Sequence, residues 1–202
     1  LENFMTDVGV PDVIVNSAGV AHPGYFEELD LDIFHWMMYV NYFGTIYTTK
    51  SIIPAMIHRG SGWIINISSM AGYLGVFGYT AYGASKYAVR GFSDALRAEM
   101  KPYGIHVSVV FPPDTETPQL EYESKYKPAE TKALSGNAGS MKPDMVALEI
   151  IKGISRNKYV INPGFEGKFL YRASMILGNA VYPIMDSLIA QARKKKSIKP
   201  DP

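Results

Sequence analysis

Short runs of apolar and β-branched residues alternate along this chain with long segments of helical character. Four of these runs are expected to be strands, at residues 12–16, 63–68, 105–111 and 158–162. The runs are continuously apolar rather than alternating, which is typical of strands buried on both faces of a parallel sheet. Because the intervening segments are long enough for right-handed helical crossovers, the order of elements predicts an α/β fold with a doubly wound parallel sheet.

Glycines and prolines bound the expected helices. Long helices are predicted over residues 30–59 and 82–103, each ended by a glycine, at Gly60 and Gly104. Pro143 suits the first turn of another helix. The sequence therefore places a helix between each pair of successive strands.

Two segments depart from this alternation. Residues 114–140 are polar and rich in turn-forming residues, so we expect a mobile loop that closes over a ligand. Residues 164–202 are expected to form an apolar helical extension with a basic tail, while residues 1–163 carry the sheet. No internal repeat or linker divides the chain further.

Composition excludes several classes of function. The formal net charge is +1, which argues against a nucleic-acid-binding surface over the whole chain. Cysteine is absent, so disulfide scaffolds and thiolate metal sites are excluded. The four histidines have no metal-binding spacing, and we expect no metal site.

Polar residues gather where three of the expected strands end, the edge at which parallel sheets bind ligands. They are Asn16–Gly19, Ser68–Ser69 and Pro112–Thr117. Tyr82 and Lys86 lie four residues apart at the start of a helix and share one face. A nearby ammonium favours the phenolate, so Tyr82 is a candidate proton donor or acceptor. By itself such a pair has little specificity, and a solvated surface pair stays an alternative.

The joint pattern resembles the short-chain dehydrogenase/reductase family. The matching residues are Asn16-Ser17-Ala18-Gly19, Asn41, Ser69, Tyr82-Gly83-Ala84-Ser85-Lys86 and Pro112 to Thr117. The resemblance covers almost the whole chain and implies a Rossmann-like fold, of which residues 1–163 would be the C-terminal part.

The resemblance implies a role for each of four residues. Ser69 would hydrogen-bond the substrate oxygen, and Tyr82 would exchange a proton with it. Lys86 would lower the pKa of the tyrosine and hold the nicotinamide ribose, and Asn41 would position a water. Ser68 competes with Ser69, but neighbours on a strand point to opposite faces, which favours Ser69.

The resemblance also implies a nicotinamide cofactor, NADPH. The residues expected to contact it are Asn16, Ala18, Gly19, Ile67, Tyr82, Lys86, Pro112, Thr115 and Thr117. The Gly-x-x-x-Gly-x-Gly loop of the family, which receives the pyrophosphate, has no match among the 18 glycines. We therefore expect the first part of the fold, and the residues that choose between NADP and NAD, to lie outside this sequence.

A second proline, Pro113, stands where the family usually has glycine after the residue matched by Pro112. This variant resembles members that reduce the 3-keto group of 3-ketodihydrosphingosine, a long-chain 2-amino-1-hydroxy ketone. One alternative is reduction of another lipid, a steroid or a 3-ketoacyl carbonyl. An alternative of a different class is a non-catalytic member of the fold that binds a partner.

Two kinds of association are expected. The helices 30–59 and 82–103 would pair across a two-fold axis in a homo-oligomer, a dimer or tetramer. Their exposed faces would carry Trp36, Met37, Tyr47 or Phe92.

The segment 165–191 has enough apolar surface to attract a bilayer, but Arg172 and Asp186 interrupt its apolar run. We expect it to lie on a membrane with Arg193 to Lys196 at anionic head groups. We expect the protein to lie on the cytoplasmic side of a membrane. This would be the endoplasmic reticulum in a eukaryote, or the cytoplasm or inner-membrane surface in a bacterium. The alternative is that the segment completes the core or the dimer interface.

Overall fold

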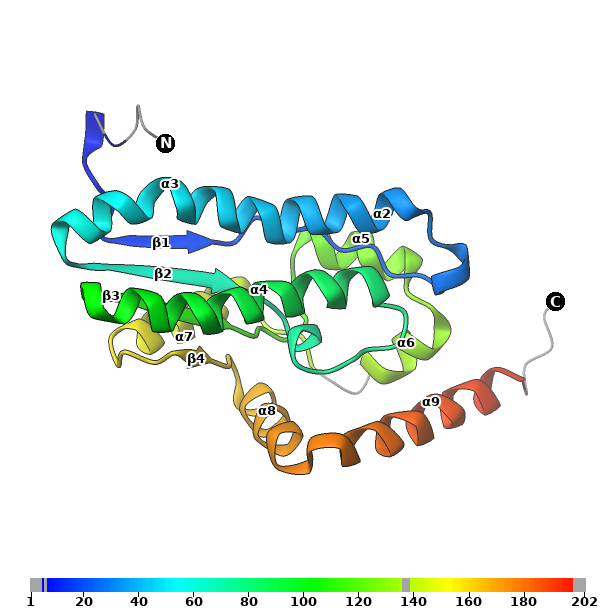
Figure 1. Cartoon of the computed structure of the whole chain (residues 1–202). Coiled ribbons are helices and arrows are strands. Elements are labelled where there is room, and N and C mark those ends of the chain that lie inside the picture. Colours follow the sequence, from blue (N-terminus) through cyan, green and yellow to red (C-terminus); the bar gives the residue numbers. More distant parts are fainter. Residues whose placement is uncertain (1–4, 6, 136–138, 198–202) are drawn as a thin grey trace.

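The computed structural model describes residues 5, 7–135 and 139–197 (Figure 1). Its centre is a sheet of four parallel strands in the order β1-β2-β3-β4. The strands are β1 (Val13–Asn16), β2 (Gly62–Ile67), β3 (Ile105–Val110) and β4 (Val160–Ile161). The parallel sheet predicted from the alternation of elements is confirmed.

Helices cover both faces of the sheet (Figure 1). On one face, α3 (Gly44–Arg59) and α4 (Thr80–Met100) pack on β2 and β3. The buried side chains of that layer are Ile52, Met56, Ile64, Leu96, Met100, Ile105 and Val107. On the other face, Ile65 of β2 joins the layer under α7 (Pro143–Ile154). Successive residues of β2 therefore face opposite layers, as the pleat requires.

One expectation for the sheet is wrong: β1 is not buried on both faces. Val13 is 41% exposed and Val15 is 49% exposed. Both side chains lie on the face of the sheet that α7 covers at β2, β3 and β4. β1 is the edge strand, and α7 does not reach it. Its continuous apolar run predicted burial on both faces of the sheet, but the face that carries Val13 and Val15 is exposed.

The first long helix is continuous but not uniform. It consists of α2 (Leu31–Met37), the π-helical turn η2 (Met38–Phe43) and α3. Gly60 ends it in the left-handed region, with φ 75°. Met37 was expected on an exposed association face, but it is fully buried. Trp36 is half exposed, so association through this helix stays a prediction.

The segment between β3 and α7 is not the turn-rich loop that its polarity suggested. It contains α5 (Pro118–Tyr126) and α6 (Ala129–Ser135). Four polar residues of these helices and their connection are buried: Glu123, Lys127, Glu130 and Thr131. Their partners come from distant parts of the chain, which is why the local sequence reads as loop. Closure of this segment over a ligand stays a prediction.

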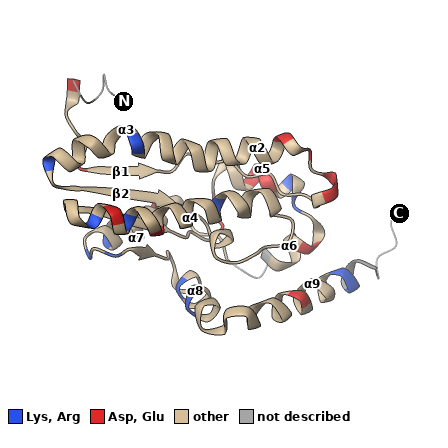
Figure 2. Cartoon of the chain, in the orientation of Figure 1, with Lys and Arg blue, Asp and Glu red and all other residues tan. Residues whose placement is uncertain are grey.

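The C-terminal residues form an arm of α8 (Phe165–Leu177), η5 (Gly178–Ala180) and α9 (Val181–Ser197), which turns along the domain (Figure 1). Tyr171 of α8 stacks on Phe111, with ring centroids 5.6 Å apart. Within the described residues, the segment Phe165–Lys194 is long and apolar enough to cross a membrane, by length and composition alone. Figure 2 shows few charges along it.

Three short 3-10 helices complete the described structure: η1 (Phe26–Glu28), η3 (Met70–Gly72) and η4 (Lys101–Tyr103). Gly104 follows η4 with φ 70°. A Cβ there would lie 2.5 Å from the carbonyl oxygen of Gly60. Glycine is therefore required both by the backbone angle and by the close approach of two chain segments.

Candidate active site

The carboxyl ends of β1 and β2 meet the first turns of α4, and the candidate residues lie at this junction. Tyr82 and Lys86 belong to α4, Ser69 follows β2, and Gly19 follows β1. Residues up to 67 positions apart in the sequence are brought together because parallel strands end at one edge of the sheet.

Lys86 is buried and held by the strand beside it. Its Nζ donates a hydrogen bond of 3.0 Å to the carbonyl oxygen of Ile67. The same nitrogen lies 5.7 Å from the ring centroid of Tyr82. Burial lowers the pKa of Lys86 to about 8, and the carboxylate of Glu123 acts in the opposite direction. At neutral pH the side chain therefore still carries its charge.

Tyr82 stays protonated at neutral pH. Burial raises the pKa of its phenol, while the hydroxyl of Ser69 beside it lowers that pKa. The carboxylates of Glu123 and Asp114 raise it further. The net shift of the pKa is therefore upward, opposite to the downward shift predicted from the ammonium of Lys86, because desolvation of the phenolate dominates.

The two serines after β2 have different surroundings. Ser68 is 2% exposed and donates a hydrogen bond of 2.9 Å to the carbonyl oxygen of Lys86, inside the domain. Ser69 is half-buried, interacts with Tyr82, and accepts a bond of 3.2 Å from the Ala71 amide. The structure thus places Ser69 beside Tyr82 and uses Ser68 to anchor α4.

Asn41 lies in the π-helical turn η2 and has a full set of partners. Its Oδ1 accepts from the amide of Val20 at 2.8 Å, and its Nδ2 donates to the carbonyl oxygen of Val20 at 2.9 Å. The Nδ2 also donates to Ser85 Oγ at 2.8 Å. Asn41 therefore ties the loop after β1 to the first turns of α4.

Gly19 lies between two of the candidate side chains. A Cβ at this position would lie 3.2 Å from Asn41 Oδ1 and 3.3 Å from Lys86 Nζ. Both separations are tighter than ordinary contacts, so any larger residue would displace the amide or the ammonium.

Other predicted cofactor contacts lie away from this junction or serve local structure. Asn16 Nδ2 donates to Thr49 Oγ1 at 3.0 Å and to Asn66 Oδ1 at 2.8 Å, within the domain. Ala18 is exposed. Thr115 Oγ1 donates to the carbonyl oxygen of Pro113 at 2.9 Å.

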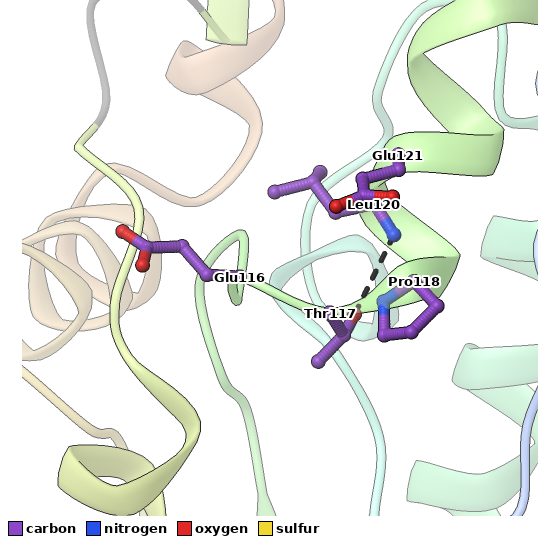
Figure 3. A pocket seen from close by; sticks show the side chains of 5 residues that line it. All are labelled: Glu116, Thr117, Pro118, Leu120 and Glu121. Atoms are coloured by element: carbon purple, nitrogen blue, oxygen red, sulfur yellow. Dashed lines mark hydrogen bonds between the residues drawn. The ribbon is translucent and has the colours of Figure 1, made fainter.

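Thr117 caps helix α5, and its Oγ1 accepts from the Leu120 amide at 3.4 Å (Figure 3). Pro112, five residues earlier, is half-buried. An open cavity of about 250 Å³ adjoins Thr117 and is also lined by Glu116, Pro118, Leu120 and Glu121. Figure 3 shows Glu116 pointing away from α5. Two residues of the range Pro112–Thr117, Glu116 and Thr117, therefore border this cavity.

Two polar residues near the site were not identified from the sequence. Tyr79 packs against Tyr82, with ring centroids 5.4 Å apart, and its hydroxyl donates a hydrogen bond of 2.7 Å to Glu123 Oε2. Glu123 is 7% exposed. Its only local signal is the spacing of four from Gln119, which is too common in helices to single it out.

The junction fits the nicotinamide and ribose half of the implied cofactor. Within the described part of the chain, Lys86 Nζ makes a single hydrogen bond, so two of its three N–H donors are available to ribose hydroxyls. The absence of a Cβ at Gly19 leaves the room beside Lys86 that such a ligand needs.

A family model described as short chain dehydrogenase matches residues 1–127. The 3-dehydrosphinganine reductase of Danio rerio is 45% identical over 163 residues, which are 81% of this chain and 49% of that protein. The chain thus spans about half the length of the curated relatives it matches.

Two solved structures resemble the fold. A short-chain dehydrogenase from Streptomyces avermitilis aligns with a TM-score of 0.77 and 26% identity, over 93% of this chain and 72% of that one. A gluconate 5-dehydrogenase from Burkholderia cenocepacia, solved in complex with NADP and tartrate, aligns with a TM-score of 0.56 and 33% identity. That alignment covers 57% of this chain and 46% of the other.

Proposed function

The chain belongs to the short-chain dehydrogenase family, and we propose that the protein containing it reduces the 3-keto group of 3-ketodihydrosphingosine with NADPH. The observation that carries this proposal is the junction of Tyr82, Ser69 and Lys86 around Gly19. The name of the Danio rerio relative supports the substrate. The NADP complex of the Burkholderia dehydrogenase supports the cofactor.

Tyr82 is the proton donor in the proposed reaction. Its raised pKa keeps the phenol protonated at neutral pH, the form needed when a carbonyl oxygen becomes an alcohol. Ser69 Oγ donates a second hydrogen bond to the same oxygen and orients it. When bound, NADPH supplies the hydride that adds to the carbonyl carbon. The hydride and the Tyr82 proton together account for the two hydrogens of the alcohol.

Lys86 and Asn41 position these groups. The ammonium of Lys86 stabilises the phenolate that Tyr82 becomes after it gives up its proton. Its two available N–H donors hold the ribose. Asn41 keeps the loop of Gly19 and Val20 against α4, so the room beside Lys86 stays open.

The test is a reductase assay on the whole protein and its Tyr82→Phe variant, with NADPH oxidation and the alcohol product both measured. Tyr82→Phe removes one hydroxyl, so we expect activity to fall by a factor on the order of 10²–10⁴ while the melting temperature stays near that of the wild type. Tyr103→Phe, at an exposed tyrosine in η4, is the matched control and should keep full activity.

Other outcomes have distinct meanings. Near-normal turnover by Tyr82→Phe would contradict the role given to Tyr82. Wild-type reduction of a steroid or a 3-ketoacyl thioester, without reduction of the sphingoid ketone, would assign another substrate. A wild-type protein that neither binds NADPH nor reduces any of these carbonyls would favour a partner-binding function.

A further inference from the structure

Glu123 is a buried carboxylate at the candidate active site that the proposed chemistry leaves without a role. It is 7% exposed and lies on the inner side of α5. Its Oε2 accepts a hydrogen bond of 2.7 Å from the hydroxyl of Tyr79, and its Oε1 accepts one of 2.9 Å from Gln119 Nε2. Both hydrogen-bond partners are neutral groups.

Two other carboxylates of this region have cations. Glu130 is also buried, and its Oε1 pairs with Arg193 Nε at 3.0 Å. Asp114 Oδ2 pairs with Lys127 Nζ at 3.0 Å. Within the described part of the chain, Glu123 forms no ion pair. A buried carboxylate gains from a cation in direct contact, and Glu123 has none among the described residues, so it is suited to a ligand that supplies one beside the reaction site.

Glu123 is close to the reacting groups. The hydroxyl of Tyr79 donates a hydrogen bond to Glu123. The ring of Tyr79 packs on the ring of Tyr82, with 5.4 Å between the ring centroids. The charge of Glu123 is felt at both site residues, since it raises the pKa of Tyr82 and opposes the lowering of the pKa of Lys86. A cation bound at Glu123 would therefore lie near a carbonyl held by Tyr82 and Ser69.

We propose that Glu123 binds the ammonium group of an amino-ketone substrate and thereby selects it over neutral ketones of the same length. This inference rests on the proposed function, whose substrate carries its amine on the carbon next to the carbonyl carbon. With the carbonyl oxygen at Tyr82, the ammonium is confined to within a few bonds of that oxygen.

The test compares Glu123→Gln with the wild-type whole protein on two substrates, with NADPH as the reductant. One is the long-chain 2-amino-1-hydroxy-3-ketone, and the other is the same ketone with hydrogen in place of the amine. Glutamine keeps the shape and both hydrogen bonds, because the amide of Gln119 can turn to accept instead of donate. Glu99→Gln, an exposed site near the far end of α4, is the matched control.

We expect kcat/KM of Glu123→Gln for the amino ketone to fall roughly 10- to 100-fold, as for loss of a charge-assisted hydrogen bond. For the deamino ketone the fall should be at least tenfold smaller than for the amino ketone, and Glu99→Gln should match the wild type on both. An equal fall on both substrates, or an unchanged preference for the amine, would overturn the proposal. A wild-type protein that reduces neither ketone would instead overturn the proposed function.

A second measurement needs no variant. The amino-alcohol product and the matching long-chain diol are compared as inhibitors of the wild type on the deamino ketone. The amino alcohol should inhibit at least tenfold more strongly than the diol below the pKa of its amine, and this advantage should vanish when the amine is neutral. Equal inhibition by the two compounds at all pH values would overturn the role of Glu123 even if Glu123→Gln failed to fold.

Discussion

Lys86 carries a charge in surroundings that oppose it. Its pKa is about 8 in the folded protein, against 10.5 for the free side chain. Below pH 8 both folded and unfolded states hold the proton, and the folded state bears the full cost of the buried charge. Between pH 8 and 10.5 the unfolded state binds more protons, so this group makes the folded state relatively more stable as the pH rises.

Lys86→Met should therefore stabilise the cofactor-free protein while abolishing its activity. The pKa difference, reduced by the lost hydrogen bond to Ile67, gives a gain of about 2 kcal/mol below pH 8. That gain should shrink as the pH rises toward 10.5. Thermal melts from pH 7 to 10 measure it. Lys101→Met, at an exposed position, is the control, and a gain independent of pH would contradict the assigned cause.

Gly19 tests the packing of the junction with a single methyl group. In Gly19→Ala the new Cβ would press on Asn41 Oδ1 and Lys86 Nζ, so we expect at least a tenfold loss of kcat/KM with a small change in stability. Gly91→Ala is the matched control, because a Cβ there meets nothing within 4 Å and Gly91 lies within α4. It should raise stability by up to about 1 kcal/mol and leave the activity unchanged. Similar kinetics for the two variants would show that Gly19 is not constrained.

Among the elements, α5 and α6 differ from the rest of the domain in what holds them. The three apolar clusters contain no residue of either helix. Hydrogen bonds of buried polar residues hold them instead, as in the bonds from Tyr79 to Glu123 and from Tyr25 to Glu130, and α6 also packs along α9. Elements held by few apolar contacts open at lower free energy than the core.

Hydrogen exchange should therefore be faster in α5 and α6 than in β2 and β3, although all four are ordered elements. Binding of NADPH and ketone should slow exchange in the two helices and leave the strands unchanged, because the substrate would contact α5 at Glu123. The measurement is exchange followed by mass spectrometry, with a peptide of α3 as an internal reference. Protection of α5 and α6 equal to that of the strands without ligand would contradict closure of this segment.

At the scale of the whole molecule, the C-terminal arm is the feature that the sheet domain does not explain. Phe165 is 83% exposed and Ile176 is 84% exposed. The arm bends at Gly178, which has φ 51°. Arg193, expected at lipid head groups, instead pairs with Glu130, and the side chains of Lys195 and Lys196 lie outside the described residues. Contact of Arg193 with lipid head groups stays a prediction, and it would compete with the pairing to Glu130.

We predict that the arm lies on a membrane rather than through it, since a charge at the centre of a spanning helix costs about 2.5–3.5 kcal/mol and both Arg172 and Asp186 are in the segment. The whole protein should float with anionic liposomes and be released by alkaline carbonate. Phe165→Glu combined with Ile176→Glu should weaken flotation, whereas Phe26→Glu, at another exposed phenylalanine, should not. Retention after carbonate treatment would indicate a spanning arm, and no flotation at low salt would exclude membrane binding.

The parallel sheet and the shared helix face of Tyr82 and Lys86 could be predicted from the sequence. Both follow from local periodicity: continuous apolar runs specify strands, and a spacing of four places two residues on one helix face. Parallel strands then bring their carboxyl ends to one edge whatever the loops do. These features could be read without coordinates because each depends on neighbours in the chain.

Burial and electrostatics could not be predicted in this way, because they depend on contacts between distant parts of the chain. The exposure of Val13 and Val15 depends on where α7 ends, and the raised pKa of Tyr82 depends on the desolvation of its surroundings. Helix α5 and the carboxylate of Glu123 depend on Tyr79, which lies 44 residues earlier in the chain. A local pattern records which residues are apolar, but the cost of a buried charge is set by groups that only folding brings near.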